Sequence, residues 1–153
     1  MNEAFRIEEI TDGKERFMEL LLIGDESADM IARYLHDGRL FVAFSDLRPI
    51  AVCAVCELES ATVEVKNLAV LGECRCRGIG RAMLGHVEKL YPACQLTLGS
   101  GETPSTLRFY RNCGFRYSHT VKDFFTDNYP EPIIEEGVLL KDMIYLTKES
   151  DRE

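Results

Sequence analysis

The stretch Arg75-Cys76-Arg77-Gly78-Ile79-Gly80-Arg81-Ala82 decides how this chain is interpreted. It follows an apolar, strand-like run and begins an amphipathic helix. The start of a helix leaves several backbone N–H groups without partners and carries partial positive charge, so it can bind an anion. Glycines let a phosphate approach the backbone closely, and the arginines beside them add charge and forked donors. We therefore interpret this loop as a pyrophosphate site for a nucleotide-bearing cofactor.

The elements on both sides of this loop predict a mixed α/β domain. Before the loop, strand-like runs follow one another as in an antiparallel meander. After it, helix and strand alternate as in a βαβ unit. We expect a largely antiparallel sheet and about four helices. The helices are expected at 14–22, at 28–35 after a cap at Ser27, at 77–91 and at 104–112, and the strands at 5–9, 40–45, 49–58, 61–70, 95–98, 115–124 and 138–146, with a loop over 126–137.

Length and composition indicate one soluble domain over residues 1–153. Apolar residues make up 46% of the chain and charged residues 29%, and no apolar run approaches the length of a membrane helix. The beginning, Met1-Asn2-Glu3-Ala4, lacks the pattern of a signal peptide, so we expect a cytoplasmic protein that does not bind a membrane. The net charge of −8 disfavours nucleic acid as a partner. It favours a cationic small substrate, although acidity can equally serve solubility alone.

Six cysteines raise the question of disulfides or a metal. Nothing else in the sequence points to secretion, so disulfides are not expected. Cys53-x-x-Cys56 lies within an apolar alternating run, and no second pair has the spacing of a zinc site. We expect no metal and interpret these side chains as buried or incidental thiols: Cys53, Cys56, Cys74, Cys76, Cys94 and Cys113.

Two familiar glycine motifs do not match the loop. The dinucleotide fingerprint requires a third glycine where this chain has Met83, and it requires the loop in the first βα unit. The phosphate loop of nucleotide hydrolases requires Gly-Lys-Ser or Gly-Lys-Thr, which does not occur here. A nucleotide-binding or redox domain therefore remains only a minor alternative.

Two segments, the first of which includes this loop, resemble those of a known family. Leu68-Ala69-Val70 followed by the loop of residues 75–84 resembles motif A of the GCN5-related N-acetyltransferases (GNAT), written Arg/Gln-x-x-Gly-x-Gly/Ala. Phe109-Tyr110-Arg111-Asn112-Cys113-Gly114-Phe115 is similar to the later Phe-Tyr-x-x-x-Gly-Phe segment of that family. The resemblance covers roughly residues 39–124. Residues 123–130 are similar to a small bacterial subgroup of uncharacterised acetyltransferases.

The resemblance implies acetyl-coenzyme A (acetyl-CoA) as the donor. In such proteins the strand before the loop pairs with the pantetheine arm, and this strand separates from its parallel neighbour, here 95–98, to open the cofactor cleft. The loop amides then hold the pyrophosphate, and Thr103 stands where the family often has an asparagine that touches the cofactor. The implied cofactor-binding residues are Leu68, Ala69, Val70, Arg75, Cys76, Arg77, Gly78, Ile79, Gly80, Arg81, Ala82, Thr103 and Ser105.

The resemblance also implies two catalytic residues. Tyr110 falls where many members carry the general acid that protonates the leaving thiolate, but it could instead be an aromatic residue packed on the sheet. Glu64 matches a general base of the histone-type members, although many members pass the proton through water. Strand alternation places Glu64 on one face with Lys66 and Leu68. Cys113 has no evident histidine partner, so we expect direct attack without a covalent enzyme intermediate.

The sequence therefore predicts an N-acetyltransferase that moves an acetyl group from acetyl-CoA to a primary amine of a small substrate. The acidic, aromatic loop 123–136 would suit a polyamine or an aminoglycoside-like acceptor, but it could also be a solvated loop. The alternative function is a non-catalytic acyl-CoA-binding module that regulates a partner. The sequence leaves open a homodimer in which the last strand is exchanged.

Overall fold

A computed structural model describes residues 4–149 of the chain. Seven strands form one sheet in the order β1-β2-β3-β4-β5-β9-β6, and a short hairpin, β7–β8, lies outside it. The strands are β1 (Arg6–Ile10), β2 (Arg39–Ser45), β3 (Arg48–Leu58), β4 (Thr62–Val70), β5 (Gln95–Ser100), β6 (Arg116–Val121), β7 (Ile134–Glu135), β8 (Val138–Leu139) and β9 (Met143–Lys148). The helices are α1 (Met18–Gly24), α2 (Ala28–Leu35), α3 (Ile79–Leu90), α4 (Pro104–Asn112) and α5 (Phe124–Asn128), with short 3-10 turns at Lys14–Phe17 and Gly72–Cys74.

The helices cover both faces of the sheet and create two cores. Side chains of α3 and α4 pack on one face around Phe41, Leu98 and Phe115. Side chains of α1 and α2 pack on the other face around Leu21 and Val42. No helix in residues 4–149 combines the length and apolarity that a bilayer span requires.

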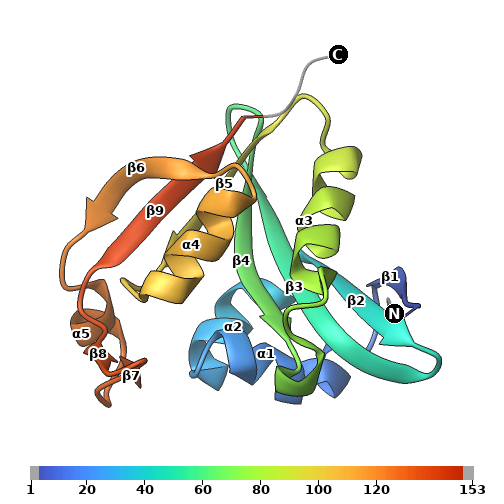
Figure 1. Ribbon diagram of the computed structural model, residues 1–153, viewed down its shortest axis with the longest axis horizontal. Helices are drawn as coiled ribbons and strands as arrows, with labels where there is room; N and C mark the ends of the chain where they lie inside the picture. The colour runs from blue at the N-terminus through green and yellow to red at the C-terminus, as the bar shows by residue number, and fades with distance from the viewer. Residues whose placement is uncertain (1–3, 150–153) are drawn as a thin grey trace.

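The sheet divides between its two central strands, β4 and β5. They form a parallel pair only from Thr62 to Val65 on β4 and from Gln95 to Leu98 on β5. Beyond this pairing β4 continues with β3 alone, and β5 continues with β9 alone. Figure 1 shows the two halves of the sheet joined at one end and diverging like a V. The opening that the resemblance implied is thereby confirmed.

A bulge interrupts β4 just where the opening starts. Val65 pairs with Val55 and Asn67 pairs with Ala54, so Lys66 is an extra residue without an opposite partner on β3. An extra residue reverses the side-chain alternation for the remainder of a strand.

This reversal corrects the predicted faces of β4. Val65 belongs to the core beneath α3 and α4, and after the bulge Leu68 packs against that same core. Ala69 instead belongs to the core beneath α1 and α2. The prediction that Leu68 shares a face with Glu64 is therefore wrong, because uninterrupted alternation does not continue through the bulge.

The C-terminal third differs from the sequence prediction. The strand expected over 115–124 ends at Val121, and α5 follows it. Asp123 adopts a left-handed conformation with φ of 57°, and its carbonyl accepts a bond from the Asp127 N–H at 2.8 Å, which closes a helical turn. The strand expected over 138–146 is divided into β8 and β9, and the loop expected over 126–137 contains β7. Residues with high β-propensity therefore form a helix here, because the local turn and its tertiary contacts determine the backbone conformation.

Polar side chains bind the free backbone groups at both ends of α2. The Met30 N–H donates to the Ser27 side chain at 3.2 Å, which confirms the predicted cap of α2. At the other end the buried Lys14 ammonium donates to three carbonyls at and just after the end of α2, those of Leu35, His36 and Gly38, at 2.8, 3.3 and 2.7 Å. This ammonium satisfies carbonyls that a helix end leaves without partners.

Candidate active site

The start of α3 presents a row of unpaired amides. This helix has twelve residues, and its first cap bond runs from the Ala82 N–H to the Gly78 carbonyl at 3.0 Å. The N–H groups of Gly78, Ile79, Gly80 and Arg81 make no hydrogen bond with any other residue in the range 4–149. The loop in front of them is exposed. Such a helix start can bind a phosphate through both its free N–H groups and its dipole.

The two glycines of the loop serve different purposes. Gly78 has a φ of +79°, and a Cβ atom built on it would meet only open space. A Cβ on Gly80 would lie 3.1 Å from Cζ of Phe109 on α4. Gly78 therefore supports the turn and leaves room above the amides. Gly80 allows α3 and α4 to pack closely, and its N–H belongs to the row of unpaired amides.

The arginines of the loop are not equivalent. Arg81 donates from its guanidinium to the carbonyl of Asn112 at 2.6 Å and so caps the end of α4. Its backbone N–H remains available, but its side chain is engaged away from the amide row. The side chains of Arg75 and Arg77 are exposed on the loop, as is Cys76. The side chain of Ile79 is buried in the core, so only the backbone of that residue can contribute.

The edge of β4 that faces the opening offers backbone groups to an extended ligand. The Leu71 N–H donates to the Ile50 carbonyl of β3 at 2.9 Å. Alternate residues of an antiparallel strand bond to the same neighbour. The backbone of Ala69 is therefore directed towards β3, whereas Leu68 and Val70 direct their N–H and C=O groups into the opening. Of Leu68, Ala69 and Val70, only Leu68 and Val70 therefore have backbone groups that β3 leaves free.

The start of α4 places Thr103 and Ser105 at the border of this region. Thr103 is buried at the N-cap position, and its hydroxyl has no hydrogen-bond partner among the described residues. The hydroxyl of Ser105 donates to the carboxylate of Glu136 in the turn between β7 and β8. Thr103 therefore retains a polar group for a ligand, whereas Ser105 already has a partner.

Tyr110 packs in the core on the α3 and α4 side of the sheet. Its ring makes edge contacts with Phe109 and Phe115, with ring centroids 5.1 and 5.7 Å apart. Burial raises the pKa of Tyr110, and the neighbouring thiols of Cys53 and Cys113 act in the same direction. Its hydroxyl makes no hydrogen bond with a described residue, and the hydroxyl oxygen is not fully buried. The ring therefore packs on the sheet, and the hydroxyl retains contact with solvent.

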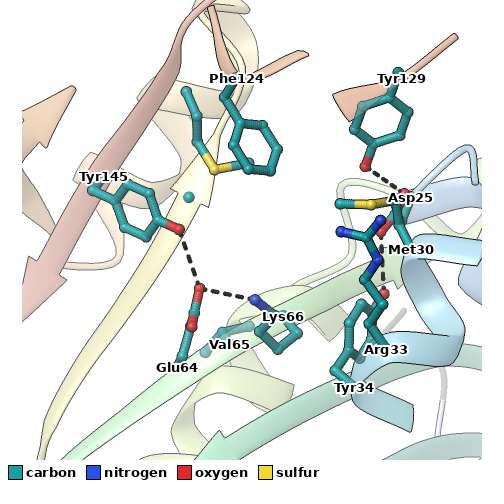
Figure 2. Close-up of a pocket in the computed structure, with 12 residues that line it drawn as sticks. Asp25, Met30, Arg33, Tyr34, Glu64, Val65, Lys66, Phe124, Tyr129 and Tyr145 are labelled. Carbon is teal, nitrogen blue, oxygen red and sulfur yellow. Dashed lines mark hydrogen bonds and ion pairs between the residues drawn. The ribbon is translucent and has the colours of Figure 1, made fainter. Parts of the chain in front are cut away.

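A pocket of about 260 Å³ lies on the other face of the sheet, beside the opening. Glu64 lines it, with its side chain 13% exposed, and accepts a bond from the Lys66 ammonium at 3.3 Å. The Tyr145 hydroxyl lies 3.5 Å from the same carboxylate oxygen (Figure 2). Burial raises the pKa of Tyr145, and the Glu64 carboxylate adds to this effect. Glu64 is thus held in place at the point where β4 and β5 begin to separate.

The opposite wall of the pocket is a hydrogen-bond network centred on Asp25. Its carboxylate accepts bonds from the hydroxyls of Tyr129 at 2.8 Å and Tyr34 at 3.4 Å (Figure 2). Tyr34 in turn accepts a bond from the buried amide of Asn67 on β4 at 3.1 Å. Burial raises the pKa of both tyrosines, and the bond to Asp25 adds to the rise for Tyr129. The network joins the C-terminal region to the connection between α1 and α2.

Only part of this pocket was predicted from the sequence. Glu64 is one of the two catalytic residues that the resemblance implies, and the aromatic members Phe124 and Tyr129 belong to the predicted loop 123–136. The acids Asp127, Glu131, Glu135 and Glu136 of that loop are exposed and do not line the pocket. The predicted acidic surface is therefore not the wall of this pocket. The lining residues that sequence reasoning missed are Asp25, Met30, Arg33, Tyr34, Val65, Gly99, Met143 and Tyr145.

The cysteines and acids do not form a cluster. All six thiols are free, and no group of three or more His, Cys, Asp or Glu side chains within residues 4–149 could hold a metal ion. Burial raises the pKa of Cys53 to about 12, which keeps this thiol protonated. Burial also raises the pKa of Cys113.

Comparisons with known proteins agree with this geometry. Residues 36–117, more than half of the chain, match the model of the acetyltransferase (GNAT) domain. The uncharacterised N-acetyltransferase YvbK of Bacillus subtilis is 30% identical over 148 residues, which cover 94% of this chain and 96% of YvbK. The chain belongs to the GNAT family of acetyltransferases.

Two solved structures are similar over almost the whole chain. A GNAT acetyltransferase from Elizabethkingia anophelis, solved with acetyl-CoA bound, is 35% identical and has a TM-score of 0.88, with 97% of this chain and 99% of that chain covered. An IAA acetyltransferase from Bacillus cereus is 34% identical with a TM-score of 0.88, and the coverage is 95% of this chain and 99% of that chain. The predicted family and fold are confirmed.

Proposed function

We propose that the protein transfers an acetyl group from acetyl-CoA to a primary amine of a small acceptor. One observation carries this proposal: the unpaired amides of Gly78 to Arg81 lie at the start of the helix that follows the open edge of β4. A ligand with a diphosphate and an extended amide-containing arm matches both features at once. The acetyl-CoA found in the relative from E. anophelis is such a ligand.

The residues of this chain fit the donor. The space above Gly78 leaves room for phosphate oxygens to accept from the four N–H groups. The amide-containing arm would pair with Leu68 and Val70 as an added strand. Thr103 offers a hydroxyl beside this path. The thioester would then lie in the opening beyond Val65, where β4 has lost its partner β5.

The two predicted catalytic side chains lie on opposite faces of the sheet. Glu64 lines the pocket on the α2 side, and Tyr110 belongs to the core on the α3 and α4 side. An acceptor amine in the pocket would attack the thioester carbonyl carbon through the opening. The carbon–sulfur bond breaks as the carbon–nitrogen bond forms, and the thiolate leaves towards the Tyr110 face. This arrangement favours direct transfer.

The two proton transfers of the reaction are divided between the same two side chains. The amine must lose a proton, and Glu64, held by Lys66 and Tyr145, is the carboxylate of the pocket beside the opening that can accept it directly or through water. The thiolate must gain a proton or a hydrogen bond. A tyrosine phenol is protonated at neutral pH, and the burial that raises the pKa of Tyr110 keeps it so, which leaves its O–H as a hydrogen-bond donor for the thiolate.

The experiment measures free thiol released from acetyl-CoA in the presence of a panel of amines, amino acids, polyamines, aminoglycosides and peptides. We expect release that depends on the amine, with intersecting initial-velocity lines as direct transfer requires. Glu64→Gln should lower kcat by about 10²- to 10⁴-fold, the range for loss of a general base. Glu59→Gln, an exposed acid in the turn between β3 and β4, is the control. Absence of amine-dependent release across the panel would refute the proposal.

A further inference from the structure

We propose that the acceptor carries an anionic group besides its amine, as an amino acid does, and that Arg33 binds this group. The inference rests on the proposed function and names the substrate class of the same pocket. It differs from the polyamine or aminoglycoside-like acceptor that the acidic, aromatic loop 123–136 would suit. Arg33 stands on α2 and lines the pocket of about 260 Å³ next to Asp25.

The charges that line the pocket balance in number but not in pairing. There are two carboxylates, Asp25 and Glu64, and two cations, Arg33 and Lys66. Glu64 is paired with Lys66, and Asp25 accepts from two tyrosine hydroxyls. Arg33 makes no hydrogen bond, ion pair or ring contact with another residue of the described range. Asp25 keeps its negative charge, because tyrosine hydroxyls are neutral donors, but its carboxylate oxygens already accept bonds. Arg33 is an exposed residue, and its guanidinium is the charged group of the pocket that makes no bond to the described residues.

The position of Arg33 assigns the two ends of the acceptor. Figure 2 shows Glu64 and Tyr145 on one side of the pocket, and Arg33 with Asp25 and Tyr129 on the other. The amine has to lie on the Glu64 side, because the opening for the thioester begins there. The remainder of a short acceptor then extends towards Arg33. A guanidinium binds a carboxylate through two parallel hydrogen bonds, whereas it repels a second ammonium.

The walls between these ends are aromatic. The rings of Tyr34, Phe124, Tyr129 and Tyr145 line the pocket, and Met30 and Met143 complete its apolar surface. Aromatic and methionine side chains offer adaptable apolar contact. An amino acid with an apolar or aromatic side chain therefore matches the pocket in charge and in polarity. The volume of about 260 Å³ lies just below the range of drug-sized sites, which suits a molecule of this size.

The test compares acceptors that differ only in the carboxylate. Phenylalanine is paired with phenethylamine, and leucine with 3-methylbutylamine, and kcat and KM are measured for each with saturating acetyl-CoA. We expect the wild-type protein to prefer the amino acid of each pair by about tenfold in kcat/KM, the effect of one charge-assisted contact of about 1.4 kcal/mol. Arg33→Gln should remove this preference by raising the KM for the amino acid, and Arg33→Lys should keep part of the preference.

Two controls separate a specific effect from a general one. Arg116→Gln removes an exposed cation from the edge strand β6, outside the pocket, and should leave the preference unchanged. The KM for acetyl-CoA should stay constant in all variants. Arg33→Glu should reverse the preference in favour of the amine without a carboxylate.

The outcomes distinguish this inference from the function on which it rests. Transfer to both members of each pair at equal efficiency, or an undiminished preference in Arg33→Gln, overturns the inference and leaves the acetyltransferase proposal standing. Failure to acetylate any amine, with acetyl-CoA still bound in calorimetry, overturns both. A preference that follows the charge at position 33 in all three variants supports the inference.

Discussion

Replacing Gly78 by glutamate tests the donor site most directly. Gly78 has a φ of +79°, and a Cβ atom at this position would have no neighbour within 4 Å, so a side chain would project into the space above the amide row. The left-handed conformation costs an L-residue roughly 1–2 kcal/mol of folding free energy. Gly137, in the turn between β7 and β8, has a φ of +76° and equally open space. Gly137→Glu therefore carries the same charge and strain at a different place.

The effect on binding follows from the charge that is introduced. Two unit charges 4 Å apart interact by about 1 kcal/mol in water and by about 4 kcal/mol at an effective dielectric constant of 20. The loop around Gly78 is exposed, so the lower half of this range applies. At about 1.4 kcal/mol per tenfold change, we expect Gly78→Glu to weaken coenzyme A binding by roughly 5- to 50-fold. Gly78→Ala should weaken it less, because a methyl group obstructs the phosphate without repelling it.

Calorimetric titration of coenzyme A into each variant provides the measurement, and urea unfolding measures the folding cost. The two glutamate variants should lose similar stability, whereas only Gly78→Glu should lose affinity. Added salt should narrow the difference in coenzyme A affinity between the two variants, because screening reduces repulsion between exposed charges. If Gly78→Glu binds coenzyme A as tightly as Gly137→Glu, no phosphate lies at the start of α3.

Three further predictions concern single side chains. Tyr110→Phe should lower kcat with little change in cofactor affinity. Because burial raises the pKa of Tyr110, the free energy of unfolding of the wild-type protein should fall as the pH rises above about 10, and this fall should be less steep in the variant. Lys14→Met leaves three carbonyls at the end of α2 without their donor and should cost about 3 kcal/mol in urea unfolding, whereas Lys89→Met on the exposed end of α3 should be neutral. Tyr129→Phe and Asp25→Ala should each raise the KM for the acceptor but not for acetyl-CoA, and their effects should not add fully, because both remove the same 2.8 Å bond.

Much of the donor half of the molecule could be predicted because its signals are local. The glycine loop, the helical spacing of α3 and the proline at the start of α4 all lie within short windows of sequence. Each is decided by backbone chemistry that operates over a few residues. The family resemblance depends on the same windows, so the amide row of Gly78 to Arg81 can be predicted from the residues alone.

The acceptor half could not be predicted, because distant residues meet there. Tyr129 bonds to Asp25 across 104 residues of sequence, and Tyr145 reaches Glu64 across 81. No periodicity in the sequence records such pairings. The bulge at Lys66 has no local signal either, yet it decides which side chains of β4 face the pocket.

This contrast has a consequence for how the two substrates are recognised. The donor would be held by backbone amides and by a strand edge, which change little when side chains change. The acceptor would be held by side chains from α2, from the connection before it and from the C-terminal region, which are free to vary without disturbing the opening between β4 and β5. Relatives that share the glycine loop can therefore differ at the positions of Arg33 and Asp25. The charge at those positions, more than the shared motif, should decide which amine each of them acetylates.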